Sequence, residues 1–236
     1  TSLISVPYTS ASASPILVDG NDLFIGTGNM MNSYDLSNSV LKWKFTADDA
    51  IVAKPVSRDN VVYFISFNGT VYALDRNDGA LKWEHDMRTK IWSSPIILNN
   101  TIYFGDRDGN INALDAQTGV SLWKYETGYS IDSAPAFFDD TLYAASYDGK
   151  VYALNASSGE LVWKSEQIYP IYASPTVEGE SVFVGALDGN LDKLNKMDGK
   201  VAGICATNGT ITASPMVRDG IVYVGSQDGG LYACNI

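Results

Sequence analysis

One short stretch, Asp106-Arg107-Asp108-Gly109-Asn110, carries the residues best suited to metal chemistry. Carboxylates and a carboxamide at alternate positions around a glycine turn are typical of calcium-binding loops. No glutamate follows where such a loop places its bidentate ligand, and the corresponding turns later in the chain keep Asp-Gly but lose the first aspartate. We therefore expect an ordinary β-turn, with Asp106, Asp108 and Asn110 as a secondary candidate metal site.

The sequence has few residues suited to other kinds of catalysis. The single histidine, His85, lies next to Trp83 on what we expect to be an outermost strand, so we interpret it as a surface side chain and not as part of a Ser-His-Asp arrangement. One histidine and two cysteines 29 positions apart do not make a zinc site. Cys234 stands where four other copies of the repeat have leucine, which favours a small buried side chain; a disulfide with Cys205 stays open.

A 40-residue repeat determines the elements that position these residues. Proline recurs at intervals of 40, at Pro15, Pro55, Pro95, Pro135, Pro175 and Pro215. Tryptophan keeps the same interval at Trp43, Trp83, Trp123 and Trp163, and Gly203 takes the fifth position. Each copy holds short aromatic and apolar runs, separated by turn sequences such as Asp-Gly and too short for helices. The pattern predicts an all-β, six-bladed β-propeller with four antiparallel strands per blade.

The two ends of the chain fall at different points of the repeat. The chain begins at the run that carries Trp in other copies and stops after YACN, and its 236 residues are four short of six full copies. We expect Ser2–Val6 to supply the fourth strand of the C-terminal blade, because a closed ring removes the sheet edges that an open array would expose. Residues 1–236 would then form a single domain.

The repeat signature S-P-x-x-x-D/N-x-x-x-Y-F-x-G-x-x-D-G-x-x-Y-A-L-D-x-x-T-G-x-x-x-W-K resembles that of pyrroloquinoline-quinone-type propellers and covers essentially the whole chain. WD40 and Kelch repeats fit worse, because the tryptophans precede Lys or Glu and the period is 40 residues, not about 50. For quinoprotein dehydrogenases the resemblance implies eight blades, a quinone between a Trp and adjacent bonded cysteines, and Ca²⁺; this chain has no adjacent cysteines. For other members it implies non-catalytic binding platforms.

Composition excludes several classes of partner. The net charge is −11 and no Lys/Arg cluster occurs, so nucleic acid is not expected. The longest apolar stretches are strand-sized, so we expect no membrane insertion. Four glycosylation sequons, at Asn68, Asn99, Asn155 and Asn208, are compatible with an extracytoplasmic protein, and we expect a monomer.

The copies disagree with one another at one mouth of the expected ring. The position four residues before each proline is Ala11, Ile51, Ile91, Ile131, Ile171 and Ile211, which indicates core, whereas the next position varies. The divergent residues at this position, in the connecting loops and at turn tips are Lys54, Arg88, Lys90, Trp92, Arg107, Tyr129, Asp132, Tyr147, Tyr169 and Tyr172. Aromatic residues with Arg are typical of protein-recognition surfaces, although the same rings could simply plug the channel. A buried Lys54 would need a carboxylate, for which Asp132 is a candidate.

These observations favour a non-catalytic propeller that binds a protein or a small ligand at this mouth without a cofactor. One alternative is a quinoprotein-type dehydrogenase that uses pyrroloquinoline quinone and calcium there. The other is a sensor module of a longer chain. The fold resemblance does not choose between them.

Overall fold

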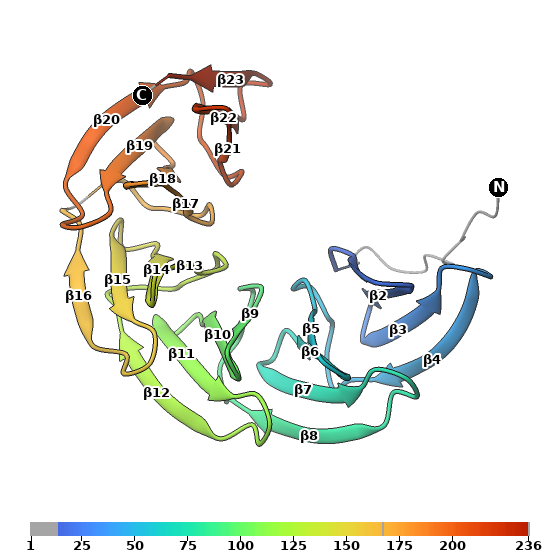
Figure 1. Ribbon diagram of the computed structural model, residues 1–236. Coiled ribbons are helices and arrows are strands. Elements are labelled where there is room, and N and C mark those ends of the chain that lie inside the picture. Colours follow the sequence, from blue (N-terminus) through green and yellow to red (C-terminus); the bar gives the residue numbers. More distant parts are fainter. Residues whose placement is uncertain (1–13, 167, 236) are drawn as a thin grey trace. The chain divides into compact units, whose positions relative to one another are not determined.

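The computed structural model describes residues 14–166 and 168–235, and their secondary structure is entirely β (Figure 1). The strands form six antiparallel sheets, one for each copy of the repeat, with strand order following the chain in every sheet. Within the described residues no helix is long and apolar enough to cross a membrane. The expected all-β architecture of six sheets is therefore confirmed.

We number the sheets 1 to 6 in chain order. Their strands are, for sheet 1, β1 (Leu17–Asp19), β2 (Asp22–Thr27), β3 (Met30–Asp35) and β4 (Val40–Thr46); for sheet 2, β5 (Val56–Arg58), β6 (Val61–Ile65), β7 (Thr70–Asp75) and β8 (Leu81–Asp86); for sheet 3, β9 (Ile96–Leu98), β10 (Thr101–Gly105), β11 (Asn110–Asp115) and β12 (Ser121–Glu126); for sheet 4, β13 (Ala136–Phe138), β14 (Thr141–Ala145), β15 (Val151–Asn155) and β16 (Leu161–Lys164); for sheet 5, β17 (Thr176–Glu178), β18 (Ser181–Gly185), β19 (Asn190–Asn195) and β20 (Val201–Ala206); and for sheet 6, β21 (Met216–Arg218), β22 (Ile221–Gly225) and β23 (Leu231–Cys234).

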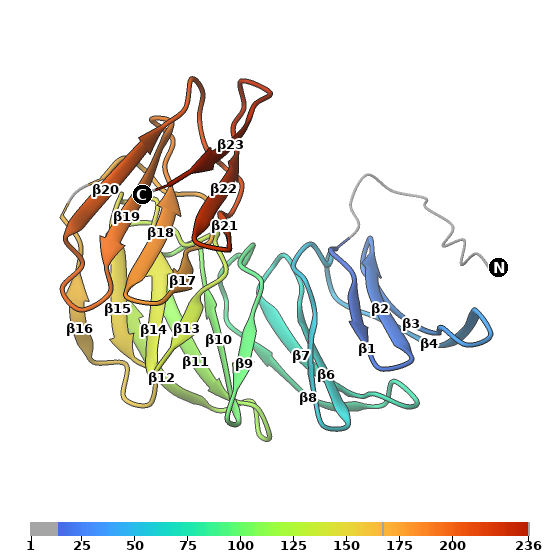
Figure 2. The ribbon, with the colours of Figure 1, turned by 45° about the horizontal axis from the view of Figure 1, so that its top comes forward.

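Sheets 1 to 5 have the expected four strands, and sheet 6 has three within the residues that the structure describes. Residues 2–6, expected to add its fourth strand, lie outside those residues. The chain divides into two compact units, one reaching to Tyr103 and including Ala113–Leu122, the other formed by Phe104–Asn112 and Trp123–Ile236. Within the first unit β5 contacts β9, and within the second β13 contacts β17 and β17 contacts β21, as Figures 1 and 2 show.

A tryptophan joins the outer strand of one sheet to the next sheet. The indole N–H of Trp83 donates to the carbonyl of Ala116 at 3.0 Å, and Trp43, Trp123 and Trp163 make the same bond to the residue 33 positions on. Each ring also packs on a glycine of the next sheet, such as Gly119, where an added Cβ would lie 2.6 Å from Cε3 of Trp83. The Trp and Gly series of the repeat therefore form one contact.

A serine joins the inner edges of neighbouring sheets. The hydroxyl of Ser94 accepts a hydrogen bond from the backbone N–H of Lys54 at 3.0 Å, and those of Ser174 and Ser214 accept from the residue 40 positions earlier. The isoleucines before the prolines, from Ile51 to Ile211, are at most 2% exposed, as expected for core residues. The Ser-Pro element of the repeat thus links successive sheets as well as starting a strand.

The contact between sheets 5 and 6 lacks tryptophan, because Gly203 takes its position on β20. A disulfide between Cys205 on β20 and Cys234 on β23 links these two sheets. Cys234 is buried as expected, and the bond that the sequence left open is present. Closing a loop of about 30 residues stabilises a folded chain by about 3–4 kcal/mol, in the range of a buried tryptophan contact.

Sheet 5 carries an unusual buried acid. Asp192 stands where sheets 2, 4 and 6 have a tyrosine, such as Tyr152, whose hydroxyl donates to Asp148 at 2.6 Å. Asp192 is 2% exposed, and its Oδ2 has no hydrogen-bond partner among the described residues. Burial, with a smaller contribution from Asp188, raises the pKa of Asp192 to about 6.

Gly119→Ala and Gly220→Ala form a matched pair that isolates the Trp–Gly contact. Both glycines have positive φ, 72° and 78°, but only Gly119 faces a ring, since nothing lies within 4 Å of a Cβ added at Gly220. We expect both variants to lose about 1 kcal/mol to backbone strain and Gly119→Ala to lose about 2 kcal/mol more to overpacking. Urea unfolding measures the difference, and equal losses would contradict the role given to the contact.

Asp192→Asn tests the buried acid through pH. A carboxyl whose pKa is higher in the folded than in the unfolded chain stabilises the fold only when protonated, so stability falls as the pH rises from about 4 to about 6. We expect the variant to gain about 1–3 kcal/mol relative to the wild type between pH 4 and pH 7. A difference in unfolding free energy that does not change with pH would show that Asp192 is not perturbed.

Candidate functional site

The divergent positions are brought together in pairs. The residue at the tip of a turn in one sheet lies near the residue 25 positions later, which precedes the first strand of the next sheet. In the first unit, the rings of Phe67 and Trp92 are 5.9 Å apart. In the second, Nε of Arg107 lies 3.5 Å from Oδ1 of Asp132. The positions that differ most between copies therefore vary as contacting pairs.

The cluster in the first unit is aromatic and cationic. Lys90 extends its ammonium over the ring of Phe67, 5.2 Å from the centroid, while Trp92 remains 37% exposed. The sequence places Phe67 at a turn tip of the candidate face but does not pair it with Trp92; the spacing of 25 positions, shared with Arg107 and Asp132, was the signal that could have found the pair. Arg88 is exposed and in the left-handed region, and its side chain makes no hydrogen bond or ion pair with the described residues.

The cluster in the second unit joins three tyrosines to the Arg107–Asp132 pair. The rings of Tyr129 and Tyr147 are 5.7 Å apart. Burial raises the pKa of the Tyr172 hydroxyl, and nearby Asp132 and Tyr147 add to the effect while Arg107 opposes it. Arg107 and Tyr129 also line a cavity of about 380 Å³ with neighbouring loop residues. Tyr129 is 61% exposed, so this surface can contact a partner directly.

Asp132 is the least exposed charged group of this cluster. Its side chain is 5% exposed and that of Arg107 is 38% exposed. Burial raises the pKa of Asp132, and the guanidinium of Arg107 lowers it. Its Oδ1 accepts no hydrogen bond from the part of the chain that is described, so the carboxylate depends on the positive charge beside it.

Two other candidates stand apart. Lys54 is exposed, so the condition under which it would need a buried carboxylate does not arise, and Asp132 pairs with Arg107. Tyr169 is 61% exposed, and its side chain makes no ring contact or hydrogen bond with the described residues. His85 lies on β8, the outermost strand of sheet 2, and is partly exposed.

The Asp106 turn is held by amides. The carboxylate of Asp106 accepts hydrogen bonds from the backbone and side chain of Asn110 and from the side chain of Asn112, at 2.8 to 3.0 Å. Asp106 is buried, whereas Asp108 is exposed. These residues act as a hydrogen-bonded turn, and within the described ranges no group of three His, Cys, Asp or Glu side chains is placed to hold a metal ion.

The residues do not match the quinone site that the repeat signature implies for dehydrogenases. That site uses a disulfide between adjacent cysteines against the cofactor, whereas Cys205 and Cys234 are 29 positions apart. Cys234 is 3% exposed and packs in the core with Ile211 and Val222. Its partner Cys205 is partly exposed.

Comparisons with known proteins agree with the repeat. A family model described as "Outer membrane protein assembly factor BamB" matches residues 6–130 and 107–236. Among solved structures, the computationally designed protein Ika8 is similar with a TM-score of 0.86 and 19% identity over 95% of this chain and 71% of its own. BamB from Moraxella catarrhalis is similar with a TM-score of 0.60 and 24% identity over 91% and 81%. A search of curated proteins found no match.

A double-mutant cycle at Arg107 and Asp132 tests the geometry of the second cluster. Arg107→Ala leaves a buried carboxylate without its counter-charge, so we expect this variant to lose more stability at pH 7 than at pH 4, and a coupling energy of about 1–2 kcal/mol with Asp132→Ala. The exposed pair Arg218–Asp219, 3.7 Å apart, is the control and should show almost none. Equal coupling in the two pairs, measured by urea unfolding, would contradict this description.

Proposed function

We propose that this chain, which belongs to the family of the outer membrane protein assembly factor BamB, is a non-catalytic propeller that binds another protein. The family description names an assembly factor, a role built on contacts between proteins. The repeat-by-repeat match over nearly the whole chain supports a propeller platform. Members of the family share the repeat, so the variable surface residues are what distinguish one member from another.

The exposed aromatic surface is the observation that carries this proposal. Trp92, Tyr147 and Tyr172 are 37–38% exposed and Tyr129 is 61% exposed, although each could have been a small polar residue, as Thr212 is in another copy. Aromatic side chains and arginine dominate the energetics of protein interfaces, because they bury a large area with few rotatable bonds. We propose that Trp92 with Lys90 and Phe67, and Tyr129, Tyr147 and Tyr172 with Arg107, are its contact residues.

We further propose that residues 1–236 form one propeller domain closed by residues 2–6. The observation in favour is that sheet 6 has three strands within the described part of the chain, where the other five have four. Pairing β23 with residues 2–6 would give every sheet the same number of strands and would cover an edge that carries the 77%-exposed Leu231. The protein would be a monomer with a single binding face.

An extracytoplasmic location fits this function. Disulfides persist in oxidising compartments and are rare in the cytosol, and Cys205 and Cys234 are bonded. The family description names a factor for the assembly of outer membrane proteins. We propose that the chain works outside the cytoplasm and without a bound cofactor.

Paired substitutions at the contact surface test the function. Trp92→Ala with Tyr172→Ala should weaken partner binding at least tenfold, because truncating a central aromatic residue typically costs more than 1 kcal/mol. The protein is immobilised, exposed to an extract of its own cells, and the retained proteins are quantified; the affinity for the main retained protein, once purified, is then measured. Leu122→Ala with Leu161→Ala, on outer strands and 52% and 40% exposed, is the matched control.

The outcome separates the alternatives. Loss of binding in the control pair but not in the aromatic pair would move the interface to the outer strands and contradict the proposal. A saturable absorbance change on titration with pyrroloquinoline quinone and Ca²⁺ would favour the dehydrogenase alternative instead. An effect confined to the aromatic pair, with no spectral change, supports a cofactor-free protein-binding surface.

A further inference from the structure

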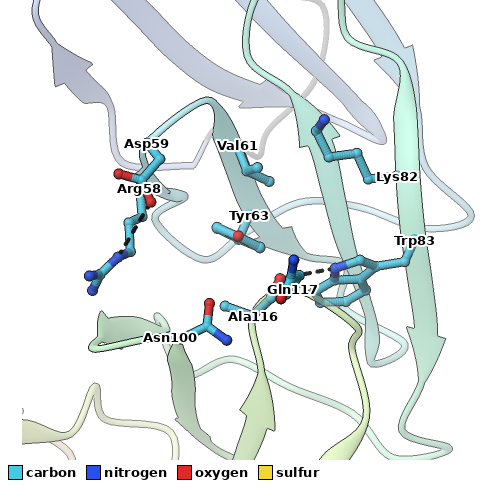
Figure 3. A pocket seen from close by; sticks show the side chains of 9 residues that line it. All are labelled: Arg58, Asp59, Val61, Tyr63, Lys82, Trp83, Asn100, Ala116 and Gln117. Carbon is cyan, nitrogen blue, oxygen red and sulfur yellow. Dashed lines mark hydrogen bonds and ion pairs between the residues drawn. The ribbon is translucent and has the colours of Figure 1, made fainter.

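A cavity of about 380 Å³ lies in the first unit, between strands β5, β6 and β8 of sheet 2 and two turns of sheet 3. Arg58, Tyr63, Lys82, Trp83, Asn100 and Gln117 line it (Figure 3), and none of them belongs to the proposed protein-binding surface. The volume lies within the range of small-molecule sites. An equivalent cavity occurs 80 residues later in the second unit, so the position is a property of the repeat and its lining is what distinguishes one copy from another.

A fixed aromatic ring forms one wall of the cavity. The N–H of Trp83 is held by the carbonyl of Ala116, and one face of the indole packs on Gly119. The ring of Tyr63 lies 6.0 Å from it at an angle of 43°. Trp83 is partly exposed and lines the cavity, which makes it the candidate stacking surface for a flat or sugar-like ring.

The hydroxyl of Tyr63 is an unused donor in this cavity. The corresponding tyrosines in sheets 3 and 4, Tyr103 and Tyr143, hydrogen-bond to Thr101 and Thr141, but Val61 replaces the threonine beside Tyr63. Among the residues described, none hydrogen-bonds to the Tyr63 hydroxyl, although the residue is only 5% exposed. Burial, together with nearby Asp59, raises the pKa of this phenol, which keeps its proton available for donation.

The cationic groups of this cavity are arranged differently from those of its neighbours. At the position of Ala116, the preceding copy has Arg76, which pairs with Asp19 and Asp22, and a later copy has Lys196, whose ammonium lies 4.0 Å from the Phe138 centroid. Ala116 contributes no charge. Positive charge comes instead from Arg58 and Lys82, which lie on either side of Tyr63 in Figure 3.

Both cations have a carboxylate partner in the protein. Arg58 lies 3.7 Å from Asp59, whose side chain is 90% exposed, and Lys82 lies 3.1 Å from Asp75, whose side chain is 21% exposed. The exposed Arg58–Asp59 pair contributes little and is readily shared with a ligand. The carboxylate of Asp59 and the apolar side chains of Val61 and Ala116 also line the cavity. The side-chain amides of Asn100 and Gln117 complete the lining and can donate to and accept from hydroxyl groups.

We propose that this cavity binds an acidic sugar of the hexuronic acid type, free or as a unit of a saccharide. The sugar ring stacks on Trp83, and the carboxylate accepts hydrogen bonds from Tyr63 and the Arg58 guanidinium with Lys82 nearby. The hydroxyl groups of the sugar bind the amides of Asn100 and Gln117. The cations match the carboxylate of such a ligand, the aromatic ring matches its sugar ring, and the amides match its hydroxyl groups. This activity is independent of the protein-binding surface.

Isothermal titration with D-galacturonate as the probe tests the site on the full chain. We expect saturable binding of galacturonate to the wild type. The affinity for the neutral sugar D-galactose should be at least tenfold weaker, and so should the affinity of Tyr63→Phe and Arg58→Ala for galacturonate. Val61→Thr, which gives Tyr63 an internal partner while leaving every lining donor in place, should weaken binding to a smaller extent. Tyr143→Phe, at the equivalent position of the other cavity, is the matched control and should bind as the wild type does.

Three results would overturn the proposal. They are the absence of saturable binding, equal affinity for galactose and galacturonate, and an affinity that Tyr63→Phe and Arg58→Ala leave unchanged. Arg58 is exposed, and Tyr63→Phe keeps the buried ring and removes only its hydroxyl, so melting temperatures near that of the wild type will confirm that both variants fold. A chemical shift change at the Trp83 indole N–H on titration places the ligand in this cavity; a change confined to the Trp163 indole N–H would place it in the other one and reject the assignment.

Discussion

The bond from a tryptophan N–H to a carbonyl of the next sheet, with a glycine beneath the ring, is the contact on which the arrangement of successive sheets depends. It uses three positions of the repeat at once, since the ring fits only where the glycine has no Cβ and the N–H needs a carbonyl 33 residues later. A large ring buried against backbone leaves little freedom for a neighbouring sheet to slide. Sequence variation elsewhere in each copy is tolerated because this contact does not change.

Where the tryptophan is missing, a covalent bond takes its place. Gly203 removes the ring from β20, and the Cys205–Cys234 disulfide joins the same two sheets at positions where no other copy has cysteine. The two devices act differently: the ring stabilises the folded contact, whereas the disulfide restricts the unfolded chain. A protein that relies on the second at one contact requires an oxidising compartment for its full stability, which agrees with an extracytoplasmic role.

The surface residues differ from copy to copy, whereas the residues at the contacts between sheets repeat. Turn-tip residues and the residues 25 positions later vary together, as an aromatic pair at Phe67–Trp92 and an ion pair at Arg107–Asp132. Geometry set by the repeat brings the two positions together, so a change at one alters the environment of the other. The linings of the two equivalent cavities also differ, since Ala116 carries no charge whereas Lys196 at the equivalent position does.

The sequence alone determined the all-β class, the six sheets and the core positions, because a strict period of 40 reports which residues must pack in the same way in every copy. It also selected most of the paired surface residues, by their failure to repeat. It did not identify Phe67 as the partner of Trp92, did not decide the burial of Lys54, left the disulfide open and missed the cavity beside Tyr63. Those features depend on distances between side chains of different sheets, which a linear pattern does not contain, and only the tertiary structure decided them.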